Sequence, residues 1–191
     1  MSNDEFRERL EKRTAAFSIE VEGMKKTLSV LNRLVNEKIV NDYAIGGAMG
    51  AMFYVEAVTT MDLDIFVLSP DDSDLMPLAP VYGKLKEWGY LPDEHEKECI
   101  NIEGTPVQIL PAYDELLQEA LAQARSFDYE GVETKVMLAE YLAAICVKTG
   151  RIKDRLRVQM LLSSEGFSIQ RFLDLLGTFN LKERYDKWQL Q

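Results

Sequence analysis

Residues 60–68 read Thr-Met-Asp-Leu-Asp-Ile-Phe-Val-Leu. The four residues after Asp64 are continuously apolar, which predicts a buried strand at about residues 61–68. Because a strand alternates its side chains between two faces, Asp62 and Asp64 would point the same way. Two neighbouring carboxylates repel each other and resist burial, so a cation between them would stabilise the pair. Magnesium suits such a site, because it is a hard cation that prefers oxygen ligands.

A glycine pair lies upstream of this strand. Residues 43–45 predict a short apolar strand that stops at Gly46 and Gly47, and the small residues after it predict a helix over 48–57. The aspartate strand is therefore preceded by a strand, a glycine turn and a helix.

The rest of the chain predicts helices around a few more strands. Helices are expected within 4–38 and at 75–88, 113–124, 138–149, 151–163 and 168–178, and hairpins at 100–110 and 127–136, while 90–99 is ambiguous. The fold class is therefore α/β or α+β, with a small mixed β-sheet flanked by helices and a helical C-terminal region. We expect a helical segment at 1–38 that packs on a core at 39–136, followed by the helical region 137–191.

Composition limits the classes of function. The chain has 191 residues, 47% of them hydrophobic, which is enough for a core, and a net charge of −10 that works against sequence-blind nucleic-acid binding. Cys99 and Cys146 form no spaced motif and are typical of reduced thiols in a cytoplasmic protein. No apolar run approaches the ~20 residues that a membrane helix needs, so no membrane association is expected.

The strand, Gly-Gly turn, helix and Asp-Leu-Asp strand together resemble the nucleotidyltransferase fold of the DNA polymerase beta superfamily. The stretch from Thr60 to Asp64 is similar to one in the small bacterial abortive-infection, or type IV toxin-like, nucleotidyltransferases. Residues 138–154 resemble the helical motif of that branch, with a lysine on one helix and an Arg-x-Lys-Asp start to the next.

The resemblance implies an enzyme that uses Mg²⁺ to transfer a nucleoside monophosphate from an NTP to a hydroxyl acceptor. Glycines let the backbone approach phosphate, and a helix N-terminus carries partial positive charge. The implied catalytic and metal-binding residues are Asp62 and Asp64, with Gln108 as a further metal ligand. The implied nucleotide-binding residues are Gly46, Gly47, Ala48, Thr60, Lys148 and Lys153.

Three positions depart from the family pattern. Gln108 stands where a third carboxylate is expected on a later strand, and its amide oxygen could bind metal but could not act as a base. Val58 replaces a residue that is often basic, and Arg157 replaces one that is commonly acidic. Under a different strand register, Glu103 or Asp114 would substitute for Gln108.

These departures leave more than one function open. As an enzyme, the protein would modify a protein or a small molecule in preference to RNA, because its net charge is negative. As a binding module, it would keep the fold without the third carboxylate and bind a nucleotide or a protein partner, as an antitoxin-like component would. A structural protein with an empty cleft is a third alternative.

Overall fold

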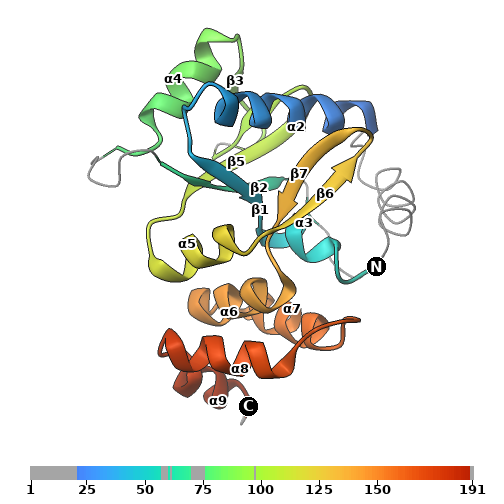
Figure 1. The fold of residues 1–191 in the computed structure, drawn as a ribbon, viewed down its shortest axis with the longest axis vertical. Helices are drawn as coiled ribbons and strands as arrows, with labels where there is room; N and C mark the ends of the chain where they lie inside the picture. The colour runs from blue at the N-terminus through green and yellow to red at the C-terminus, as the bar shows by residue number, and fades with distance from the viewer. Residues whose placement is uncertain (1–20, 57–59, 61, 70–75, 97, 190–191) are drawn as a thin grey trace.

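The computed structural model describes residues 21–56, 60, 62–69, 76–96 and 98–189. Seven strands form a mixed sheet in the order β3-β4-β5-β2-β1-β7-β6 (Figure 1). At its middle, β2 (Leu63–Leu68) is antiparallel to β1 (Asp42–Ile45) and parallel to β5 (Thr105–Pro111). The α/β fold class and the buried aspartate strand are therefore confirmed.

Helices cover the sheet and bury β2 from both sides. On one side α2 (Val21–Asn36) packs against β7, β1 and β5, and on the other α3 (Gly47–Met52) and α5 (Glu115–Ala122) pack against β2 (Figure 1). Leu63 and Ile65 are completely buried. The apolar sequence of β2 stabilises a strand at the centre of the sheet, because burial of each apolar side chain contributes to the stability of the folded protein.

Two hairpins complete the sheet. The turn at Glu103 and Gly104 joins β4 (Ile100–Ile102) to β5, and the turn at Glu130 and Gly131 joins β6 (Arg125–Tyr129) to β7 (Val132–Val136). All four turn residues have positive φ, as type I′ hairpin turns require. Both predicted hairpins are confirmed. The short β3 (Leu91–Pro92) pairs with β4 in the stretch whose sequence was ambiguous.

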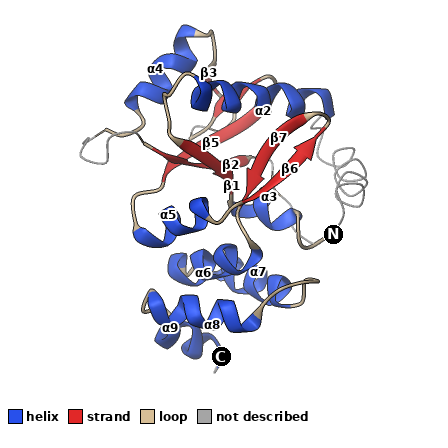
Figure 2. Ribbon diagram, viewed as in Figure 1, coloured by secondary structure: helices blue, strands red, loops and turns tan. Residues whose placement is uncertain are grey.

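The C-terminal part is helical, as predicted. It contains α6 (Ala139–Thr149), α7 (Ile152–Leu162) and α8 (Ile169–Thr178), and Figure 2 shows them grouped at one end of the molecule, beyond α5. A further helix, α9 (Lys182–Gln189), packs on α8 and α6. The sequence did not predict α9, because its residues are mostly polar and none is buried.

Two predicted helices are shorter than expected. The helix after the glycine pair ends at Met52 rather than at 57, because the N–H groups of Tyr54 and Val55 both donate to the carbonyl of Ala51 and turn the chain. The helix predicted at 75–88 is α4 (Ala79–Glu87). Residues 4–20 of the N-terminal prediction and Val58 lie outside the described residues. Within the described part, no helix has the length and apolar character to cross a bilayer.

The hydroxyl of Thr27 ties α2 to the sheet. Thr27 is fully buried, and its Oγ1 lies 2.8 Å from the carbonyl oxygen of Ile102 and 3.1 Å from Oγ1 of Thr105. We expect Thr27→Val to lower the free energy of unfolding by about 1–2 kcal/mol, because valine keeps the shape but leaves buried polar partners unpaired. Urea unfolding followed by circular dichroism measures the change.

Ser29→Ala is the matched control, because the Ser29 hydroxyl donates to the carbonyl of Lys25 on the exposed face of the same helix. Its effect is expected to stay within about 0.5 kcal/mol. Equal losses in the two variants would contradict the anchoring role of Thr27.

Candidate functional site

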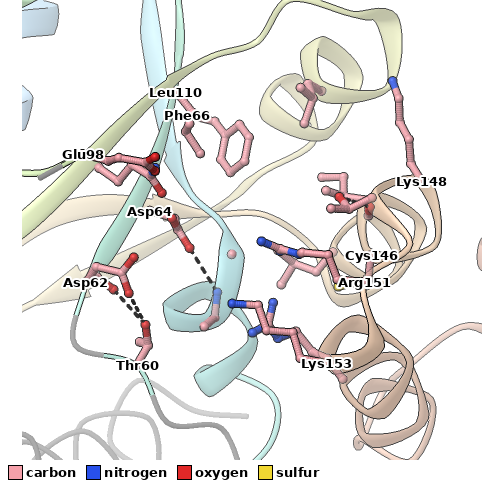
Figure 3. A pocket seen from close by; sticks show the side chains of 18 of the residues that line it. Thr60, Asp62, Asp64, Phe66, Glu98, Leu110, Cys146, Lys148, Arg151 and Lys153 are labelled. Atoms are coloured by element: carbon pink, nitrogen blue, oxygen red, sulfur yellow. Dashed lines mark hydrogen bonds between the residues drawn. The ribbon is translucent and has the colours of Figure 1, made fainter. Parts of the chain in front are cut away.

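Two carboxylates form one wall of a cavity of about 620 Å³. Asp62 lies directly before β2 and Asp64 within it, and both side chains border the cavity (Figure 3). Thr60 Oγ1 donates a hydrogen bond to Asp62 Oδ1, and the Ala48 N–H donates to Asp64 Oδ2 over 3.3 Å. The two aspartates are therefore held in place from two different segments, and both face the same space.

The glycine turn is pressed directly against β2. The N–H of Gly46 donates to the carbonyl oxygen of Asp64 over 2.9 Å. A Cβ on Gly46 would collide with the ring of Phe66, and a Cβ on Gly47 would overlap the Asp64 carboxylate. Gly47 also has a φ of +55°, a conformation that favours glycine. The Gly-Gly sequence is thus required by the close approach of the turn to the aspartate strand.

Electrostatics at this wall favour a bound cation. Burial raises the pKa of Asp64, and the charge on Asp62 raises it further, whereas the Ala48 N–H and the guanidinium groups of Arg157 and Arg151 oppose the shift. The ionised pair is therefore held in an unfavourable state without a cation. Since a divalent ion would offset this repulsion, the chemistry of the two carboxylates fits Mg²⁺.

The remaining ligands of such an ion would come largely from a bound phosphate and water. Among the residues that the structure describes, no three His, Cys, Asp or Glu side chains are gathered as a ligand set. Mg²⁺ in phosphoryl-transfer sites commonly uses one or two carboxylates together with substrate oxygens. The pair Asp62 and Asp64 is consistent with that mode of binding.

The strand register places Gln108 beside the carboxylates. Gln108 lies on a later strand, β5, as expected, and it pairs with Asp64 of β2. Its Nε2 donates to Glu98 Oε2 over 2.8 Å. Glu103 is not a substitute, because its carboxylate accepts from the Tyr90 hydroxyl and borders a different cavity. Asp114 does border the site.

Glu98 is a site residue that the sequence did not reveal. It precedes β4 in the ambiguous stretch 90–99, and its exposed side chain borders the cavity beside Asp64 (Figure 3). Its neighbours in sequence are mostly charged, and neither the period of a strand nor that of a helix singles it out. Its place at the cavity and its contact with Gln108 identify it.

Basic side chains from α6 and α7 form the opposite wall. Arg151 and Lys153 extend towards Asp64 and the start of α3, whereas the ammonium of Lys148 points towards α5 (Figure 3). There its Nζ lies 2.6 Å from Asp114 Oδ2. Arg157 also borders the cavity, with a side chain that is only 11% exposed. In sequence it stood out only as a departure from the family pattern.

The structure brings nearly all the predicted site residues together. Gly46 is the exception, since it supports the turn without lining the cavity. The predicted residues that border the cavity are Gly47, Ala48, Thr60, Asp62, Asp64, Gln108, Lys148 and Lys153.

Comparison with solved structures identifies the fold. The structure is similar to an antigenic nucleotidyltransferase-like protein from Paracoccidioides brasiliensis, with a TM-score of 0.52 and 15% identity over 86% of this chain and 90% of that one. It is also similar to the antibiotic-resistance factor ANT(2'')-Ia, with a TM-score of 0.51 and 13% identity over 91% of this chain and 96% of the other. A scan of family models and a search of curated proteins give no match. The chain has the nucleotidyltransferase fold, as expected, and the toxin-like branch stays a prediction.

Proposed function

We propose that the protein is a magnesium-dependent nucleotidyltransferase that transfers a nucleoside monophosphate from an NTP to a hydroxyl group. The observation that carries this proposal is the division of one cavity into two walls of opposite charge, Asp62 and Asp64 on one side and Arg151, Lys153 and Arg157 on the other. A triphosphate bound together with a divalent cation needs both kinds of wall, one to hold the cation and one to hold the anion.

Each residue has a distinct task in this proposal. Asp62 and Asp64 would hold the Mg²⁺, with Gln108 next to them as a neutral oxygen donor. Bound there, the metal would withdraw charge from the transferring phosphoryl group. The backbone at Gly47 and Ala48 would lie against the phosphates, and Lys153 would neutralise their charge. The acceptor oxygen would bond to the α-phosphorus and release its proton to water while the bond to the departing pyrophosphate breaks.

The acceptor is proposed to be a protein hydroxyl or a small molecule. The net charge of −10 disfavours a nucleic-acid acceptor, because a polyanion would be repelled over most of the surface. Lys148 is proposed to act at the edge of the site, because its ammonium is paired with Asp114 and extends beside the exposed ring of Tyr113.

The direct test is incubation with Mg²⁺ and each labelled NTP, followed by measurement of pyrophosphate release and of label on the protein. Pyrophosphate release that depends on Mg²⁺ and stops in EDTA supports the proposed enzymatic function. Measurable NTP binding without any release would overturn it and would favour the non-catalytic binding module. Absence of binding as well would favour a structural protein.

Gln108→Asp tests whether the missing carboxylate limits turnover. The new carboxylate would lie beside Asp64, and we expect pyrophosphate release to rise by about a hundredfold, at the lower end of the range that a positioned acid or base contributes. Combining it with Glu98→Gln should raise the rate further, because the negative charge opposite position 108 is then removed. Stopped assays at saturating NTP measure these rates.

Gln108→Asn is the matched control for this series, because it shortens the side chain equally without adding charge. It is expected to leave the rate at or below that of the original protein. An increase as large as that of Gln108→Asp would show that side-chain length, and not the carboxylate, controls turnover.

A further inference from the structure

A buried ionic cluster supports the basic wall of the cavity. Asp154 lies in the first turn of α7 and is completely buried. Its carboxylate accepts hydrogen bonds from the backbone N–H of Arg151 over 3.1 Å, from Nε over 2.8 Å and from Nη2 over 3.1 Å. Arg157 Nη1 lies 3.6 Å from Asp154 Oδ1. One carboxylate therefore fixes two guanidinium groups, each about one helical turn away from it.

Both guanidinium groups act on the opposite wall. Arg151 and Arg157 border the cavity, and the positive charge of each opposes the rise in the pKa of Asp64. Cys146 is buried at the same cavity, and the positive charge of Arg157 opposes the rise in its pKa that burial causes. The two arginines are thus directed across the cavity towards the aspartates.

The cluster leaves an excess of positive charge facing the cavity. Burial of a cation such as Arg157 is costly unless it is paired, and a single carboxylate serves both arginines. With Lys153 included, three cations stand against one anion on this wall, and no described residue pairs with the ammonium of Lys153. A guanidinium carries five N–H donors in a planar fork, so each arginine keeps donors for a second oxyanion.

We propose that Arg151, Lys153 and Arg157 bind a polyphosphate chain without the help of a metal ion, with Asp154 as the positioning residue that aims the two guanidinium groups. This deepens the proposed function, since it names the groups that hold the triphosphate, but it does not depend on turnover. The metal would then be needed at the aspartates for transfer and not for capture of the anion.

The test is calorimetric titration of the full chain with ATP, and separately with inorganic triphosphate, in EDTA. Binding of either anion is expected, and Arg157→Ala should weaken it by about tenfold to a hundredfold, as loss of a charge-assisted hydrogen bond does. Arg157→Lys keeps the positive charge without the planar guanidinium, so its affinity should lie between those of Arg157→Ala and the original protein. Lys86→Ala, an exposed cation on α4, is the matched control and should bind as the original protein does.

The aspartates give a readout of opposite sign. Without metal they repel the anion, so Asp62→Asn should tighten binding of ATP in EDTA by a few fold while weakening it in Mg²⁺. Equal affinity for the two probes would assign recognition to the polyphosphate alone, whereas tighter binding of ATP would add a contact with the nucleoside. Both results support the proposal.

Two results would overturn it. One is that neither anion binds the folded protein in EDTA, with thermal melting showing that the fold is intact. The other is that folded Arg157→Ala and Arg157→Lys bind both anions as tightly as the original protein. Failure of pyrophosphate release with binding in EDTA preserved would instead overturn the enzymatic function and leave this site standing.

Discussion

Asp64→Asn is expected to reduce Mg²⁺-dependent pyrophosphate release by about a thousandfold. Asparagine keeps the oxygen that accepts from the Ala48 N–H, so the geometry of the turn is preserved while the charge that would bind the metal is lost. A metal ion contributes several kcal/mol of charge stabilisation to phosphoryl transfer, which corresponds to a factor of that size. Initial rates at saturating NTP and Mg²⁺ measure the loss. Asp62→Asn should behave alike, because both aspartates border the same cavity.

Asp64→Asn is also expected to be more stable than the original protein when metal is absent. Burial and the charge of Asp62 raise the pKa of Asp64 above its ordinary value, so at neutral pH the ionised carboxylate disfavours the folded state. Removing that charge should raise the melting temperature in EDTA. Conversely, Mg²⁺ should raise the melting temperature of the original protein more than that of the variant.

Asp186→Asn on the exposed surface of α9 controls for a general effect of losing one negative charge. It should alter neither the rate nor the response to Mg²⁺. An Asp64→Asn variant that retained full activity, or that responded to Mg²⁺ as the original protein does, would remove the aspartates from the proposed mechanism.

The centre of the fold and one wall of the site could be predicted because local sequence determines them. The apolar run after Asp64 requires burial, the period of a strand places Asp62 and Asp64 on one face, and Gly46 and Gly47 mark the turn. The hairpin at Glu103 and Gly104 could also be predicted, and it fixes where β5 begins. In each case the signal lies within a few residues of the feature.

The rest of the site depends on contacts between distant segments. Glu98 enters the site only because the strand before it is folded back against β4, and the sequence around it has no period. Arg157 could have been recognised from its spacing, since Arg151, Asp154 and Arg157 follow one another at intervals of three and so lie on one face of a helix start. Which way that face points depends on how α7 packs against α6, and the chain alone does not reveal it.

Gly47→Ala is expected to abolish most metal and nucleotide binding, although it adds only one methyl group. The new Cβ would overlap the Asp64 carboxylate and would have to exist at a φ of +55°, so either the aspartate side chain or the turn must move. The left-handed conformation alone costs about 1–2 kcal/mol in a residue with a Cβ. Displacing Asp64 should lower pyrophosphate release at least a hundredfold. Titration with Mn²⁺ and chemical unfolding separate loss of the site from loss of the fold.

Gly83→Ala is the matched control, because Gly83 lies within α4, has no atom within 4 Å of an added Cβ and does not have a positive φ. There the same methyl group should raise stability by about 0.5–1 kcal/mol, as alanine favours a helix over glycine, and leave the rate unchanged. A Gly47→Ala protein that binds Mn²⁺ and Mg²⁺–ATP normally would show that the turn and Asp64 separate readily. The close approach of the glycine turn to the aspartate strand would then not be what holds the metal-binding carboxylate in position.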